Sequence, residues 1–253
     1  MPNSIFNLNK KIVLITGGLG IQGPEHKKAF EKEGAKVIVT DVKGGDYQID
    51  VTDKNSINKA VAEIVKKYGQ IDVLINNAGA TGKQVVNASV PLENQQLKNW
   101  EYILKVNLTG TFLCSQAVGK EMAKKGEGSI INIASIYGLV GPDFKIYQQS
   151  DYVGKKMGTP AAYAASKGGV ISLTRYLASY WAEKNVRVNC VTPGGIFDNQ
   201  SKIFVNKYSK KVPLGRMAKK NEISGTLLYL ASNLSSYVTG ANIIVDGGLT
   251  SKA

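Results

Sequence analysis

Residues 12–23 are IVLITGGLGIQG, an apolar run followed at once by a glycine-rich turn, and the amphipathic stretch Pro24–Glu33 comes directly after them. This order predicts a buried strand, a tight turn and a helix. Glycines in such a turn let the backbone approach a pyrophosphate, whose charge is met by amide N–H groups at the start of the helix. A glycine cluster alone is weak evidence, but its place between a strand and a helix favours a dinucleotide site.

Outward from this stretch, apolar runs alternate with amphipathic segments, which predicts a parallel sheet with helices on both faces. The expected strands are Ile12–Ile15, Lys36–Thr40, a third ending at Asp50, Val73–Ile75, Ile130–Ala134, Arg187–Val191 and Ile243–Val245. The expected helices are 24–33, 53–68, about 97–123 and 160–183. Because no linker divides the chain, we predict one Rossmann-type, doubly wound α/β/α domain over residues 1–253.

The composition is that of an ordinary globular protein, with 43% hydrophobic and 20% charged residues among 253. No apolar run approaches the roughly 20 residues of a membrane helix, and the first residues lack the layout of a signal peptide. Cys114 and Cys190 lie in apolar stretches and suggest no disulfide framework. We therefore expect a cytoplasmic protein with no membrane partner.

The only histidine, His26, stands among charged residues and is expected to be solvated. One imidazole and two distant cysteines predict no metal site. The net charge of +13 could attract nucleic acid or anionic small molecules, or it could simply solubilise the protein. No reading helix, RNA-binding motif or arginine stripe is present, so no specific nucleic-acid partner is expected.

Two acidic residues follow the glycine-rich turn. Asp41 ends the second strand, 24 positions after Gly17, where a carboxylate can accept both ribose hydroxyls of an adenosine. The same carboxylate would repel a 2′-phosphate, which favours NAD over NADP, although Lys43 could partly offset the repulsion. Asp50, in IDVTD, could meet the adenine amino group or could cap a turn or helix.

Tyr163 and Lys167 are four residues apart on an expected helix, so both side chains share one face. Acid–base work at neutral pH needs the tyrosine pKa lowered by about 3 units from ~10, which is about 4 kcal/mol. An ammonium ~4 Å away supplies roughly that much at an effective dielectric constant of ~20, against roughly 1 kcal/mol in water. The pair is therefore sufficient for proton transfer in a dry site.

Together these motifs resemble the short-chain dehydrogenase/reductase family over nearly the whole chain. They occur in the family's order: TGGLGIQG, Asp41, Asp50-Val51, NNAG (76–79), Asn107, Ser135, YAASK (163–167), PGG (193–195) and VTGANIIVDGG (238–248). The resemblance implies hydride transfer between a nicotinamide and a hydroxyl or ketone of a small-molecule substrate. It also implies a homotetramer, or a dimer.

The resemblance assigns roles residue by residue. Ser135 would orient the substrate oxygen, Tyr163 would act as the acid, and Lys167 would hold the nicotinamide ribose. Asn107 would bind a water that relays protons to Lys167. The remaining cofactor-binding positions would be Gly17, Gly20, Ile21, Gly23, Asp41, Asp50, Val51, Asn77, Ala78, Gly79, Pro193 and Ile196.

One position departs from the family's T-G-x-x-x-G-x-G pattern. Ile21 occupies the place of the second glycine, and Gly20 comes one residue early. This difference puts the local geometry of the phosphate loop in question.

Two segments near the expected site bear on the substrate. Tyr163 follows Ser135 by 28 positions, which leaves an inserted active-site loop at 136–162 (the insert); residues 197–220 form an expected substrate lid (the lid segment). Both mix aromatic residues with lysines, namely Lys145, Lys155, Lys156, Lys202, Lys207, Lys210 and Lys211. These lysines could bind an anionic sugar or nucleotide-sugar, or they could only solvate exposed loops.

The sequences IYGLVGPDF and PGGIFDNQ are similar to dehydrogenases of flagellin and surface-glycan modification, which implies a sugar substrate in carbohydrate biosynthesis. Two other functions remain open. A 3-oxoacyl-[acyl-carrier-protein] reductase would share the whole catalytic group, although Asp41 and the long insert count against it. A non-catalytic NAD-binding regulator would have no need of the intact Tyr163/Lys167 pair.

Overall fold

The computed structural model describes residues 5–81, 90–152 and 155–251. Its centre is a parallel sheet made of β1 (Ile12–Thr16), β2 (Lys36–Asp41), β3 (Tyr47–Gln48), β4 (Val73–Asn76), β5 (Gly128–Ile133), β8 (Val186–Pro193) and β9 (Asn242–Val245). The spatial order is β3-β2-β1-β4-β5-β8-β9. The order reverses between β1 and β4, and ligands bind beyond the carboxyl ends of the strands at such a point.

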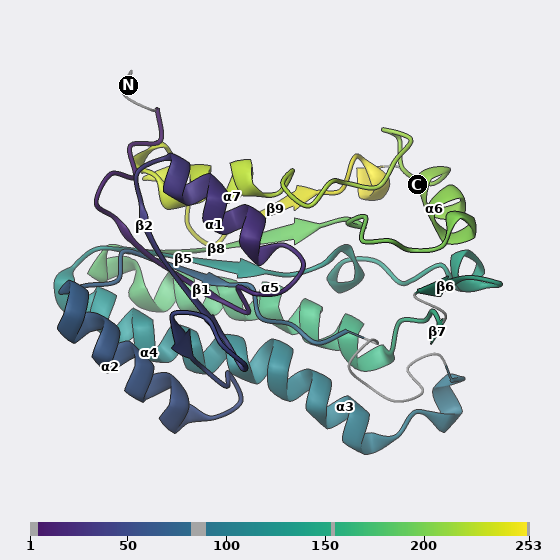
Figure 1. Ribbon diagram of the computed structural model, residues 1–253, viewed down its shortest axis with the longest axis horizontal. Helices are drawn as coiled ribbons and strands as arrows, with labels where there is room; N and C mark the ends of the chain where they lie inside the picture. Colours follow the sequence, from purple (N-terminus) through teal and green to yellow (C-terminus); the bar gives the residue numbers. More distant parts are fainter. Residues whose placement is uncertain (1–4, 82–89, 153–154, 252–253) are drawn as a thin grey trace.

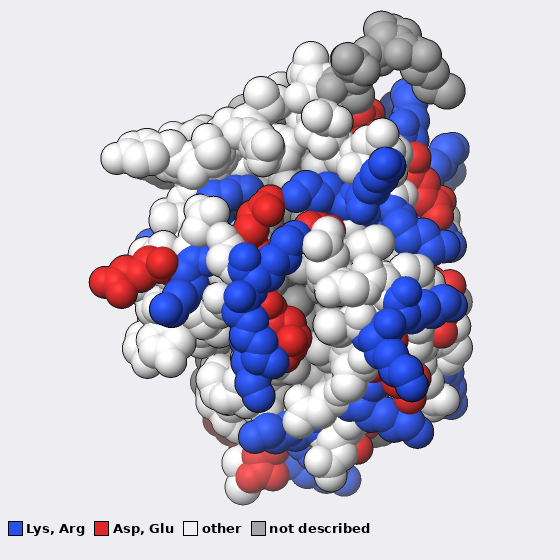
Figure 2. Space-filling view, turned by 90° about the vertical axis from the view of Figure 1, so that its left-hand side faces the viewer, with Lys and Arg blue, Asp and Glu red and all other residues white. Residues whose placement is uncertain are grey.

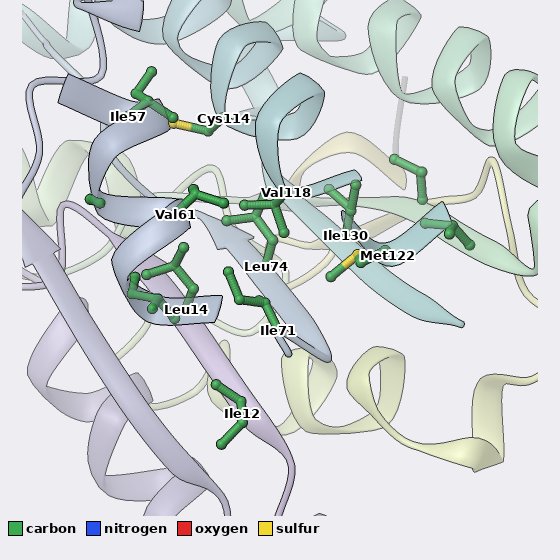
Figure 3. Close-up of a cluster of buried hydrophobic side chains, with 14 of the residues drawn as sticks. Ile12, Leu14, Ile57, Val61, Ile71, Leu74, Cys114, Val118, Met122 and Ile130 are labelled. Carbon is green, nitrogen blue, oxygen red and sulfur yellow. The ribbon is translucent and has the colours of Figure 1, made fainter. Parts of the chain in front are cut away.

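Helices cover both faces of the sheet, as the sequence predicts (Figure 1). One face carries α1 (Gly23–Lys32) and α7 (Ser224–Ala231), and the other carries α2 (Lys54–Tyr68), α4 (Gly110–Lys125) and α5 (Ala161–Trp181). Figure 3 shows the apolar core on the face covered by α2 and α4, where side chains of these helices meet the sheet. Labelled there are Ile12, Leu14, Ile57, Val61, Ile71, Leu74, Cys114, Val118, Met122 and Ile130. The three-layer arrangement of one domain is therefore confirmed.

The expected single helix over 97–123 is wrong in one respect. The structure has α3 (Leu97–Leu104), a π-helical turn at Lys105–Thr109, and then α4. A π turn inserts one residue, and such turns are frequent at functional sites. The turn centres on Asn107, whose carbonyl accepts a hydrogen bond from the Thr111 hydroxyl at 2.7 Å. Helical spacing in the sequence does not reveal such an insertion.

The expected solvation of His26 is also wrong. Its side chain is fully buried, and its Nδ1 lies 2.9 Å from the Ser224 hydroxyl on α7. Phe30, one helical turn later on the same face, is buried as well. The charged neighbours of His26 lie on the other faces of α1, so local composition gave the wrong environment.

Outside the sheet, a short antiparallel pair, β6 (Asp151–Tyr152) and β7 (Lys155–Lys156), lies in the insert, and α6 (Lys202–Ser209) lies in the lid segment. Both stand beyond the carboxyl ends of the strands (Figure 1). Short 3₁₀ turns occupy Leu92–Asn94, Ile136–Gly138, Phe144–Tyr147, Ala182–Lys184, Asn233–Ser235 and Leu249–Ser251. The third strand was expected to end at Asp50, but β3 ends two residues earlier.

Basic side chains are numerous on the face seen in Figure 2, where acidic side chains lie among them. This face is at the left-hand side of Figure 1, away from α6 and the insert. An ion-paired group stabilises the same side of the fold, because buried Asp72 bonds Lys125 at 2.7 Å and Lys11 at 3.5 Å. Part of the net charge thus lies far from the carboxyl ends of the strands.

Among the described residues, no helix has the length and apolarity needed to cross a membrane. The same part of the chain holds no group of three or more His, Cys, Asp or Glu side chains that could bind a metal ion.

Candidate active site

The turn between β1 and α1 depends on two glycines at its ends. Gly17 has φ +60°, and a Cβ added there would lie 2.6 Å from the Ala78 Cα. A Cβ on Gly23 would lie 2.1 Å from the Gly18 carbonyl oxygen. These approaches exclude any side chain and keep the first turn of α1 close to β1. The backbone at Ile21 has no positive φ, and its side chain is 42% exposed, so the turn does not require glycine there.

The NNAG segment after β4 is fastened to this turn. The Asn77 amide donates to the carbonyls of Thr16 and Gly17 at 3.1 and 2.8 Å, and the Ala78 N–H donates to the Thr16 hydroxyl. Since β1 and β4 are parallel neighbours, their carboxyl ends meet at one edge of the sheet. The Asn77 side chain therefore fixes the shape of the glycine turn by bonding the carbonyls at its start.

Asp41 and Asp50 lie on the adenosine side of the expected site. The Asp41 carboxylate accepts from the N–H groups of Leu19 and Val42, at 3.2 and 2.8 Å, and is thereby held beside the glycine turn. One oxygen of Asp50 accepts from both the N–H and the hydroxyl of Thr52, each at 2.8 Å. Asp50 thus caps a turn and also lines the cleft, so its two predicted roles are compatible.

These residues line one cleft of about 1490 Å³, which exceeds the roughly 300–1,000 Å³ of a typical small-molecule pocket. The predicted positions that line it are Gly17, Gly20, Ile21, Asp41, Asp50, Val51, Asn77, Ala78, Gly79, Ser135, Tyr163, Lys167, Pro193 and Ile196. Gly23 and Asn107 are not among the lining residues. The space is sufficient for a dinucleotide and a substrate together.

The chain's own atoms fit a dinucleotide in this cleft. The Gln22 side-chain nitrogen is buried without a hydrogen-bond partner and belongs to a residue that lines the cleft. No side chain caps the start of α1, and because Pro24 has no N–H and the His26 N–H donates to the Gln22 carbonyl, the N–H groups of Gly23 and Glu25 are those that could meet a pyrophosphate. A neutral amide donor and a helix N-terminus favour the same anionic group.

Tyr163 and Lys167 lie on the first turns of α5, on one face as predicted. The Lys167 ammonium donates to the Ile133 carbonyl at 2.7 Å and lies 5.8 Å from the centre of the Tyr163 ring. Burial lowers the pKa of Lys167 to about 8. Burial also raises the pKa of Tyr163, and a hydrogen bond with the Ser135 side chain offsets part of that rise.

The expectation that Lys167 lowers the pKa of Tyr163 is therefore wrong for the chain by itself. Burial of the Tyr163 phenolate raises its free energy by more than the Ser135 hydrogen bond lowers it, so the neutral phenol is favoured. The arrangement holds a proton on Tyr163 at neutral pH, next to a serine hydroxyl that can orient an oxygen. Such a site can donate a proton to a carbonyl oxygen as it is reduced.

Asn107 lies behind the cleft in the π turn and is fully buried. Its Oδ1 accepts from the Ala80 N–H at 2.6 Å, and its Nδ2 donates to the Ala80 carbonyl and the Ser166 hydroxyl, each at 3.0 Å. The side chain therefore joins the loop after β4 to α5. The water relay that the family resemblance assigns to Asn107 stays a prediction.

The insert and the lid segment pack against each other, and residues of both line the cleft; we call the two segments together the roof of the cleft. The rings of Tyr147 and Phe204 lie 5.6 Å apart, and the Lys207 ammonium donates to the Gln148 carbonyl at 2.6 Å. An ion pair joins Lys211 to Asp143. These contacts couple the two segments by apolar packing and by charge.

The lysines of the insert and the lid segment differ in their surroundings. Lys207 and Lys211 serve the contact between insert and lid segment, because loop carbonyls and Asp143 lie within their reach. Lys156 lines the cleft. The side chain of Lys155, and residues 153–154, lie outside the described part of the structure.

Several residues of the cleft were not predicted from the sequence. Tyr137, Tyr147 and Thr159 of the insert line it, and so does Tyr208, whose hydroxyl accepts from the Gly195 N–H. The abundance of tyrosines in the two segments was a signal. Irregular segments have no periodicity, so the sequence could not indicate which side chains face inward.

Comparisons with known proteins agree with this geometry. A family model described as enoyl-(acyl carrier protein) reductase matches residues 23–250. A 3-oxoacyl-[acyl-carrier-protein] reductase of Thermotoga maritima is 35% identical, over 96% of this chain and 98% of the relative. An NAD-dependent glycerol dehydrogenase of Listeria innocua is 32% identical, over 98% and 96%.

A solved structure shares the fold as well. The short chain dehydrogenase of Leptospira borgpetersenii, crystallised with bound NAD+, is 36% identical with a TM-score of 0.88, over 99% of this chain and 97% of that chain. The matching motifs, the parallel sheet and the cleft beyond its carboxyl edge thus have one explanation. The chain belongs to the short-chain dehydrogenase/reductase family and is an oxidoreductase that acts on CH–OH groups.

Proposed function

We propose that the protein interconverts a secondary alcohol and a ketone with NAD, on a sugar or nucleotide-sugar of glycan biosynthesis. The observation that carries the proposal is that Ser135, Tyr163 and Lys167 line the same cleft as the glycine turn and Asp41. A nicotinamide bound there would supply or accept the hydride. The chain's own residues then have to orient the reacting oxygen, move its proton and exclude water.

Each catalytic side chain has a role that its surroundings support. The Ser135 hydroxyl, which accepts from the Tyr137 N–H at 3.3 Å, is held at the end of β5 and would orient the substrate oxygen. Tyr163, neutral because of burial, would donate the proton in reduction and accept it in oxidation. Lys167, held on the Ile133 carbonyl, would place its ammonium beside both the phenol and the nicotinamide ribose.

The preference for NAD over NADP rests on Asp41. Its carboxylate is fixed by two backbone N–H groups at the rim of the glycine turn, where the adenosine ribose would lie. A fixed negative charge favours ribose hydroxyls as hydrogen-bond donors and opposes a 2′-phosphate. Lys43 is exposed beside it and would weaken this preference without reversing it.

The sugar substrate is supported by the polar roof of the cleft and by Lys156, a cation that could meet an anionic group. The Thermotoga relative favours a second candidate, reduction of a 3-oxoacyl group on acyl carrier protein. A regulator without catalysis is the third, and the intact Tyr163/Lys167 pair counts against it.

One screen separates these candidates. NADH and NADPH oxidation would be followed with keto-sugars, keto nucleotide-sugars and a 3-oxoacyl thioester. We expect turnover with NADH and a sugar ketone. Faster turnover of the thioester with NADPH would favour the acyl reductase, and tight NADH binding without turnover of any ketone would favour a regulator.

We infer a homotetramer, or a dimer, on the basis of exposed apolar surface. Tyr176 and Tyr180 on α5 stack at 6.2 Å and are 66% and 67% exposed, and Ile244 on the edge strand β9 is 45% exposed. Surfaces of this kind commonly mark interfaces. Light scattering after gel filtration tests the inference, and a monomer at every concentration would contradict it.

A further inference from the structure

Three hydroxyl groups of the insert form a continuous chain along the wall of the cleft. The Tyr137 and Tyr147 hydroxyls are 2.6 Å apart, and the Tyr147 hydroxyl is 2.6 Å from the Thr159 hydroxyl. All three residues line the cleft that also holds Ser135 and Tyr163. Tyr137 follows Ser135 by two positions and Thr159 precedes Tyr163 by four, so the chain of hydroxyls lies between the two reacting groups in sequence.

The number of protons and lone pairs shows which hydrogen-bonding groups of the three hydroxyls remain unused. Each hydroxyl donates one proton and has two lone pairs. The three hydroxyls carry three protons and share two hydrogen bonds, and either partner of each bond can be the donor. Whichever way the bonds run, one proton stays available to another acceptor, and the hydroxyls of Tyr137 and Thr159 at the two ends each keep at least one free lone pair.

The chain stays uncharged at neutral pH. Burial raises the pKa of Tyr137 and of Tyr147 above the ordinary tyrosine range, so both phenols keep their protons. Neutral hydroxyls arranged as donor and acceptor match a ligand group that can both accept and donate. A neutral alcohol group has this property, whereas a carboxylate or phosphate only accepts.

Nearby polar side chains of the lid segment are already engaged. The Asp198 carboxylate, which lines the cleft, pairs with Lys220 at 2.8 Å. The Gln200 amide donates to the Ile196 carbonyl and accepts from the Asp198 N–H. The hydroxyl chain, in contrast, has a proton and lone pairs that none of its own two hydrogen bonds uses.

We propose that Tyr137, Tyr147 and Thr159 form a substrate subsite that binds a second, uncharged hydroxyl close to the reacting carbon. The inference rests on the proposed alcohol–ketone chemistry and narrows its substrate class to hydroxyketones and the corresponding diols or polyols. A ketone without the hydroxyl leaves the spare proton of these hydroxyls without an acceptor, and that desolvation cost selects against the ketone.

The test uses two ketones that differ by one hydroxyl, 2-hydroxycyclohexanone and cyclohexanone, with NADH. Wild-type kcat/KM is expected to be higher for the hydroxyketone. Tyr147→Phe and Thr159→Val should lower kcat/KM for the hydroxyketone by about 3- to 10-fold, mainly through KM, as expected for loss of one neutral hydrogen bond. Both variants should change kcat/KM for cyclohexanone much less, so the preference for the hydroxyketone should shrink.

Matched variants control for structure. Thr159→Ser keeps the hydroxyl and should keep the preference, and Tyr237→Phe removes a phenol from a fully exposed side chain and should change nothing. An equal loss for both ketones in Tyr147→Phe would mean that the chain only supports the roof, and would overturn the subsite. A wild-type enzyme that does not distinguish the two ketones would overturn it as well.

A binding measurement separates this inference from the proposed function. If neither ketone is reduced, the proposed chemistry fails, and titration of the enzyme–NADH complex with cyclohexane-1,2-diol and cyclohexanol then decides the subsite. Preferential binding of the diol that is lost in Tyr147→Phe would support the subsite independently of turnover. Equal binding of the two alcohols would reject it.

Discussion

The Lys167 ammonium lies 5.8 Å from the centre of the Tyr163 ring and is held there by a 2.7 Å hydrogen bond to the Ile133 carbonyl. The strand β5 thus positions the lysine, and α5 positions the tyrosine. Because both groups are buried, each is driven toward its neutral form, so the pKa of Lys167 falls to about 8 and that of Tyr163 rises. This balance underlies the first two predictions.

Tyr163→Phe should reduce turnover by roughly 10²- to 10⁴-fold, because phenylalanine fills the space but donates no proton. NADH affinity, measured by fluorescence titration, should change little. Normal turnover in this variant would rule out Tyr163 as the acid.

The two reaction directions should depend on pH in opposite ways. Reduction needs the protonated phenol, so its kcat/KM should be constant near neutral pH and fall as Tyr163 ionises. Oxidation needs the phenolate, so its kcat/KM should rise through the same alkaline range. Because burial raises the pKa of Tyr163, both changes are expected at alkaline pH. Parallel profiles in the two directions would contradict a shared acid–base group.

Asp41→Ala should weaken NAD binding and relax the preference toward NADP, because the variant lacks both the ribose acceptor and the repulsion of a 2′-phosphate. Loss of one charged hydrogen-bond acceptor corresponds to about 1.5–3 kcal/mol, or roughly a 10- to 150-fold weaker Kd for NAD. The ratio of kcat/KM for NADH and NADPH measures the preference. An unchanged ratio would remove Asp41 from the ribose site, and Glu63→Ala, at an exposed position of α2, is the matched control for loss of one negative charge.

Ile21→Gly restores the family's glycine pattern and should alter NAD affinity by less than about threefold. The backbone at Ile21 has no positive φ, and the side chain is partly exposed, so no strain is relieved. Calorimetric titration with NAD measures the effect. A large gain in affinity would mean that the isoleucine side chain obstructs the phosphate site.

Protonation of His26 should destabilise the fold in acid. Burial lowers its pKa from 6.5 to about 4, so the unfolded chain binds the proton first. Stability is therefore unaffected by this group above about pH 6.5, and falls as the pH drops from 6.5 to about 4. The difference between the two pKa values corresponds to at most about 3 kcal/mol.

Urea denaturation of wild type and His26→Gln at pH 7 and pH 4.5 measures this contribution. Glutamine can keep a hydrogen bond to Ser224 but does not titrate, and the carboxylates of both proteins titrate alike. We expect wild type to lose more stability in acid than the variant. Equal losses would show that His26 becomes solvated before it is protonated.

Local sequence patterns were enough to predict the parallel sheet, the glycine turn and the order of the catalytic residues. These features depend on local patterns: apolar runs predict strands such as β5, spacing by four joins Tyr163 to Lys167, and glycine marks the close approach at Gly17. Such signals can be read from the sequence because each is carried by residue types at short spacing, even where the contact itself, as between Gly17 and Ala78, joins distant positions.

Tertiary structure alone decided the burial of His26, the π turn at Asn107, the pKa balance at Tyr163 and the hydroxyl chain of the insert. The burial of His26 and the position of Asn107 involve partners far away in sequence, Ser224 and Ala80, whereas the hydroxyl chain depends on how one irregular segment folds back on itself. Burial and hydrogen bonding are set by which segments meet in space. Irregular segments such as the insert carry no periodic pattern that could foretell those contacts.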